Sequence, residues 1–103
     1  MASDERIRDN QTDMLFEAIL LLKTKEECYR FFQDLATVAE IKALAQRLEV
    51  AHMLEKDITY NKIEEVTGAS SATISRVKRC LNYGADGYKL VLERLEAQEK
   101  EQL

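Results

Sequence analysis

Apolar residues recur every three or four positions along most of the chain, and this period predicts helices. No run alternates apolar and polar residues in the way that a half-buried strand would. Short polar stretches interrupt the pattern and divide it into six segments. The expected helices span about 10–23, 25–35, 38–56, 60–66, 71–82 and 87–96.

The composition agrees with an all-α fold. The 103 residues include no proline and three glycines, and such a chain favours helices. The length fits one domain. We place this helical domain at residues 10–96, after an N-terminal arm of residues 1–9 that we expect to be flexible. Residues 97–103 are expected to form a frayed tail.

The helix expected over 10–23 is apolar around nearly its whole circumference. Such a helix needs cover on all sides, and a chain this short buries only a modest core alone. A second copy of the chain would supply that cover, so we expect a homodimer. The apolar positions are Leu15, Phe16, Ala18, Ile19, Leu20, Leu21 and Leu22.

Two capping boxes mark the starts of the second and third helices. Thr24 precedes Glu27 by three residues, and Thr37 precedes Glu40 by the same spacing. The second helix then carries four apolar residues at the spacing of one core face. These are Cys28, Phe31, Phe32 and Leu35.

The cysteines and the histidine do not predict a metal site. Cys28 and Cys80 are 52 positions apart and form no CxxC pair, so we expect reduced, buried cysteines that pack as small hydrophobes. His52 is the only histidine and has no partner at metal-ligand spacing. We expect no cofactor.

Residues 60–82 have the spacing of a helix-turn-helix. Thr59 is a candidate N-cap, Gly68 suits a left-handed helix end, and Ser70 or Ser71 can cap the next helix. Two short helices joined by a glycine turn can place the second helix in the major groove of DNA. The residues expected to pack inward are Ile63, Val66, Ile74 and Val77.

The opposite face of the second of these helices carries small and basic side chains. Ser71, Ala72 and Ser75 would allow close approach to base edges, and Lys78 and Arg79, with Arg76 at the flank, would suit phosphates. Residues 58–83 carry a net charge of +2, although the whole chain carries −4. On spacing alone, DNA binding and an ordinary solvated surface are equally acceptable interpretations.

The string TGASSATISRVKRCLNYGADGY resembles the C-terminal half of the Trp repressor family. With ECYRFF and EIKALAQRLEVA, it resembles still more the Trp-repressor-related proteins of the YerC/YecD type, over residues 15–88. The resemblance implies a six-helix Trp-repressor-like fold with a helix-turn-helix in an intertwined homodimer. It also implies a transcriptional regulator of the repressor kind that binds double-stranded DNA.

The resemblance places the groove-facing positions on Ser71, Ala72 and Ser75. Flanking contacts fall on the preceding helix, where Asn61 and Glu64 replace an arginine and a lysine of the repressor, and Ser71 replaces an isoleucine. The operator sequence therefore cannot be carried over. The predicted DNA-binding residues are Tyr60, Asn61, Lys62, Ser71, Ala72, Ser75, Arg76, Lys78 and Arg79.

The tryptophan pocket of the family maps onto Thr37, Arg47, Arg76, Val77 and Cys80. Val77 stands where the repressor has a glycine, and Cys80 stands where it has a serine. The added bulk favours a closed, vestigial pocket, so we do not expect tryptophan to be the effector. A smaller carboxylate ligand is the alternative.

Other classes of protein fit this sequence less well. The sequence contains no nucleophile beside a base and no Gly-rich phosphate loop, so we do not expect an enzyme. A protein-interaction module built on the helix-turn-helix is the main rival. The N-terminus does not have a signal-peptide pattern, and Ala18–Leu22 is too short to span a bilayer. We therefore expect a cytoplasmic protein without membrane contact.

Overall fold

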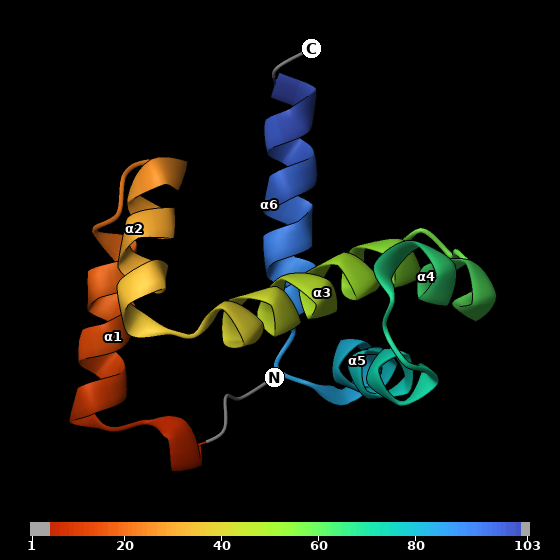
Figure 1. Cartoon of the computed structure of the whole chain (residues 1–103), viewed down its shortest axis with the longest axis horizontal. Coiled ribbons are helices and arrows are strands. Elements are labelled where there is room, and N and C mark those ends of the chain that lie inside the picture. The colour runs from red at the N-terminus through yellow and green to blue at the C-terminus, as the bar shows by residue number, and fades with distance from the viewer. Residues whose placement is uncertain (1–4, 102–103) are drawn as a thin grey trace. The chain divides into compact units, whose positions relative to one another are not determined.

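The computed structural model describes residues 5–101, and this part of the chain is all-α (Figure 1). It contains six α-helices after one short 3-10 helix, and no strand. The six-helix prediction is therefore confirmed. The bounds are η1 Glu5–Ile7, α1 Asn10–Leu20, α2 Lys25–Leu35, α3 Val38–Glu55, α4 Tyr60–Thr67, α5 Ser71–Tyr83 and α6 Gly87–Glu101. None of these helices is long and apolar enough to cross a membrane.

The chain divides into two compact units, one ending at Lys42 and the other beginning at Ala43. The continuous helix α3 contains the boundary between them. In the first unit, α1 and α2 contain no buried residue. The expected core face of α2 is thus open in the single chain, where the rings of Phe31 and Phe32 meet edge to face at 5.5 Å and Cys28 is exposed.

Local capping signals determine where α2 and α3 begin. The Thr37 hydroxyl accepts a hydrogen bond from the Glu40 N–H at 3.1 Å, and the Glu40 carboxylate accepts one from the Thr37 N–H at 2.8 Å. The latter bond lowers the pKa of Glu40. At α2, Thr24 accepts from the Glu27 N–H at 3.1 Å, as predicted.

The hydrophobic core lies in the second unit, between the later turns of α3 and the helices α4 and α5. Burying one Val, Leu, Ile or Met side chain stabilises a fold by about 1.5–3 kcal/mol. The partly buried side chains of Ile58, Tyr88 and Leu92 pack against this core. The buried residues are Val50, Ala51, Met53, Leu54, Ile63, Ala69, Ile74, Val77 and Leu81.

The two ends of the chain differ in part from the expectations. Residues 5–7 of the expected arm form a 3-10 helix, and α6 continues to Glu101, beyond the expected end of the domain at residue 96. Residues 1–4 and 102–103 lie outside the described residues. The flexible arm and the frayed tail stay predictions.

Candidate nucleic-acid interface

Helices α4 and α5 form a helix-turn-helix joined by residues 68–70. The hydroxyl of Thr59 caps α4 by accepting from the Lys62 N–H at 3.3 Å, and Gly68 ends the helix with a φ of 75°. A residue with a side chain rarely adopts this φ, which explains the glycine. Ser70, not Ser71, caps α5, because its hydroxyl accepts from the Thr73 N–H at 3.1 Å.

Side-chain hydrogen bonds brace the turn. The Thr67 hydroxyl donates to the Ile63 carbonyl at 2.7 Å and accepts from the Ala69 N–H at 3.1 Å. The Gln46 amide, on α3, donates to the Thr67 carbonyl at 3.1 Å. The role of Gln46 cannot be predicted from the sequence, because no short-range pattern links residues 21 positions apart.

The inward face of the motif is as predicted at three of its four positions. Ile63, Ile74 and Val77 are fully buried or nearly so. The prediction for Val66 is wrong, since its side chain is 55% exposed. The buried side of α4 runs from Ile63 toward Thr67, one helical turn later, and this places Val66 at the rim.

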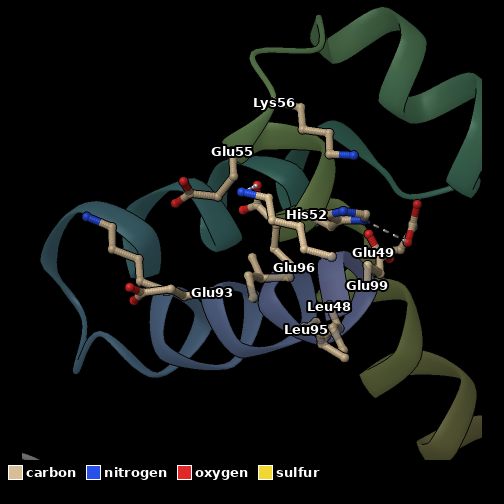
Figure 2. Close-up of a pocket in the computed structure, with 12 residues that line it drawn as sticks. Leu48, Glu49, His52, Glu55, Lys56, Glu93, Leu95, Glu96 and Glu99 are labelled. Atoms are coloured by element: carbon tan, nitrogen blue, oxygen red, sulfur yellow. Dashed lines mark ion pairs between the residues drawn. The ribbon is translucent and has the colours of Figure 1, made fainter. Parts of the chain in front are cut away.

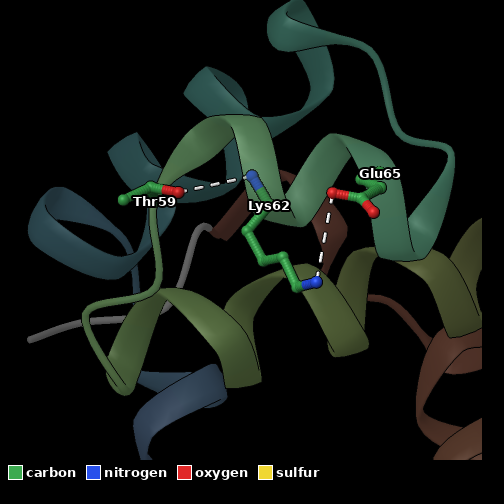
Figure 3. A network of polar contacts seen from close by, with 3 residues as sticks. All are labelled: Thr59, Lys62 and Glu65. Carbon is green, nitrogen blue, oxygen red and sulfur yellow. Dashed lines mark hydrogen bonds and ion pairs between the residues drawn. The ribbon is translucent and has the colours of Figure 1, made fainter.

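The nine predicted DNA-binding side chains are all exposed on α4 and α5. On α4, Lys62 pairs with Glu65 at 4.0 Å (Figure 3). Within the described chain, no ion pair joins Arg76, Lys78 or Arg79 to a carboxylate. The outer face of α5 therefore presents the uncompensated cations Lys78 and Arg79 behind a first turn of small side chains, with Arg76 at its flank.

A small cavity of about 110 Å³ lies behind α5. Four of the five predicted pocket residues line it, namely Arg47, Arg76, Val77 and Cys80, together with Thr73 and Tyr88. The fifth, Thr37, is not among the lining residues and belongs to the first unit, where it caps α3. Binding pockets for small molecules usually measure about 300–1,000 Å³, so this cavity is small.

Two residues that line the cavity, Cys80 and Tyr88, were not predicted as the structure shows them. Cys80 is a free thiol and exposed, as is Cys28, so the expectation of buried cysteines is wrong. Cys28 lies on a face of α2 that the single chain leaves uncovered, and Cys80 lines the cavity while remaining exposed. Tyr88 of α6 also lines the cavity, outside the predicted pocket residues. Its burial raises the pKa of its phenol and the nearby Cys80 raises it further, whereas Arg47 and Arg76 lower it.

A larger hollow, of about 800 Å³, lies between α3 and α6 (Figure 2). Leu48, Leu92 and Leu95 give it an apolar lining, and charged side chains surround them. Among the latter, His52 pairs with Glu49 at 3.7 Å. No residue of α4 or α5 lines this hollow.

Comparison with known proteins agrees with this architecture. The Trp repressor protein family matches residues 10–96. The uncharacterized protein YerC of Bacillus subtilis (strain 168) is 60% identical over 97 residues, which are 94% of this chain and 93% of that protein.

Two crystal structures have the same fold. A TrpR-like protein from Eubacterium eligens is 53% identical, with a TM-score of 0.88 over 90% of this chain and 96% of that one. A candidate Trp repressor from Staphylococcus aureus is 51% identical, with a TM-score of 0.88 over 93% of this chain and 96% of that one. With its six helices and its helix-turn-helix, the chain belongs to the Trp repressor family.

Proposed function

We propose that this protein is a sequence-specific DNA-binding transcriptional regulator of the repressor type. One observation carries the proposal. The first turns of α5 expose Ser71, Ala72 and Ser75, and the next turns expose Lys78 and Arg79, while the opposite face of the helix is buried in the core. Small side chains in front of cations suit a helix end that enters the major groove between two phosphate backbones.

The two groups of side chains have different roles in this proposal. Ser71 and Ser75 read base edges through their hydroxyls, and Ala72 allows close approach or contacts a thymine methyl group. Lys78 and Arg79 bind phosphates and fix the register of α5. The exposed Tyr60, Asn61, Lys62 and Arg76 add flanking contacts.

The regulator acts as a homodimer in this proposal. In the first unit no described residue is buried, and Leu20 of α1 is 83% exposed. Apolar surface on this scale marks a site of association. A two-fold dimer presents two copies of α5, so its site is a palindrome with half-sites about one helical turn apart.

Tryptophan is not the effector in this proposal. Val77 is 1% exposed and occupies the wall of a cavity that is small for an indole. The retained Arg47 and Arg76 leave a smaller carboxylate as the alternative ligand. Calorimetry with L-tryptophan at micromolar concentrations should show no heat of binding, and a clear gain in DNA affinity on adding tryptophan would refute this part.

Variants of α5 test the proposal. Anisotropy with a labelled pool of random-sequence duplexes should show that Lys78→Ala and Arg79→Ala each weaken binding to all sequences and reduce the salt slope by about one. The matched control is Lys25→Ala on α2, which should bind like the wild type. A protein-interaction module, the rival function, would show no salt-dependent DNA binding at all.

A further inference from the structure

We propose that Tyr88 of α6 is a positioning residue whose ring holds α5 in its DNA-reading orientation, so that no small molecule is needed for this. The inference rests on the proposed function, since it assumes that α5 reads DNA. It concerns a side chain outside the predicted DNA-binding and ligand-pocket sets.

The surroundings of Tyr88 carry the inference. Its side chain is half-buried, packs against the hydrophobic core and lines the cavity behind α5. Val77 and Cys80 of α5 and Arg47 of α3 line the same cavity. An aromatic ring at this place supports the inner face of the helix whose outer face exposes Ser75 and Lys78.

The short connection between α5 and α6 strengthens the coupling between Tyr88 and α5. Only residues 84–86 separate the two helices. The Gly84 N–H donates to the Cys80 carbonyl at 2.9 Å, and a Cβ at Gly84 would lie 2.4 Å from that carbonyl oxygen. Because this connection is short and leaves no room for a side chain at Gly84, the position of Tyr88 at the start of α6 restrains the end of α5.

The cavity volume indicates that the ring takes the place of a ligand. With Tyr88 present, about 110 Å³ remain between α3, α5 and α6, less than an aromatic effector needs. The packing that such an effector would supply is therefore already provided within the chain, by Tyr88 and Val77, which both line the cavity.

The test compares three variants with the wild type by hydrogen exchange and by binding to a duplex selected from a random pool. Tyr88→Ala should speed exchange of amides 74–83 more than that of amides 50–54, and should weaken DNA binding about 3-fold to 30-fold. Tyr88→Phe keeps the ring and should match the wild type in both measurements. Tyr83→Ala, which removes a 79% exposed tyrosine at the end of α5, is the matched control and should also match it.

The outcomes separate the inference from the proposed function. Unchanged exchange in α5 of a folded Tyr88→Ala protein would overturn the inference, as would a Tyr88→Phe protein that behaves like Tyr88→Ala. If Tyr88→Ala does not fold by circular dichroism, Tyr88→Leu replaces it, with the same expected results. If the wild type selects no duplex, the proposed function fails, and the exchange data still decide whether Tyr88 holds α5.

Discussion

The Gln46 side-chain amide donates a hydrogen bond to the Thr67 carbonyl, with 3.1 Å between Nε2 and the oxygen. This bond joins α3 to the last residue of α4, directly before the turn of the helix-turn-helix. Thr67 in turn holds the turn through its hydroxyl, which accepts from the Ala69 N–H. The path from Gln46 through Thr67 thus anchors the turn that sets the angle between α4 and α5.

Replacing Gln46 by Ala should loosen this turn. The change removes one partly buried hydrogen bond, so the free energy of unfolding should fall by about 0.5–1.5 kcal/mol. Urea unfolding followed by circular dichroism measures it. Gln33→Ala on the exposed face of α2 is the control, and equal losses in the two variants would show that the Gln46 bond contributes nothing.

Replacing Glu65 by Gln should strengthen DNA binding. The carboxylate of Glu65 now partly neutralises Lys62, and exposed pairs of this kind are worth about 0.2–1 kcal/mol. Affinity for every duplex should rise by about 1.4-fold to fivefold at low salt, and less at high salt. Glu96→Gln removes the similar partner of Lys100 on α6 and should leave DNA binding unchanged. No gain in the first variant would remove Lys62 from the interface.

The phenol of Tyr88 should ionise at higher pH than an exposed tyrosine. Burial, and then Cys80, raises its pKa above the ordinary 10.0. Because the folded-state pKa is the higher one, the contribution of the neutral phenol to stability is complete below pH 10 and is lost as pH rises through the folded pKa.

Tyrosinate absorbance during an alkaline titration checks this prediction. The wild type should show a late-titrating phase, and Tyr88→Phe should remove that phase. A Tyr88→Phe protein that keeps the late phase would assign it to another tyrosine.

Replacing Leu20 by Lys should split the proposed dimer or unfold the chain. The Leu20 side chain is exposed in one subunit, so the change costs nothing unless a partner covers it. Sedimentation equilibrium compares this variant with Gln11→Lys, an exposed position of α1 that should leave the dimer intact. A wild type that is a stable monomer at micromolar concentration would contradict the prediction.

Local signals in the sequence were enough to predict the helices and the turn. Thr59 and Ser70 cap helices through hydrogen bonds that span three residues, and the φ of Gly68 is the one its position suggested. The same pattern placed Ile74 and Val77 in the core. Each of these features depends on neighbours within one or two helical turns.

Features that depend on distant contacts could not be predicted. The bond from Gln46 to Thr67 and the place of Tyr88 beside Arg47 arise only when three helices pack. Asp86, directly before α6, has a φ of 63°, outside the extended region of an N-cap residue. Helical periodicity alone could not show this turn geometry, nor that Val66 lies at the rim of the motif.

Selection of bound duplexes from a random pool tests the central claim most directly. The wild-type protein is incubated with the pool at physiological salt, and the bound DNA is sequenced after several rounds. The selection should enrich a palindromic motif with half-sites about one helical turn apart. Ser75→Ala, which alters one exposed hydroxyl of α5, should change the preference at one position in each half-site by about 1–3 kcal/mol. A selection that enriches no motif, or enriches the same motif with both proteins, would contradict base reading by α5.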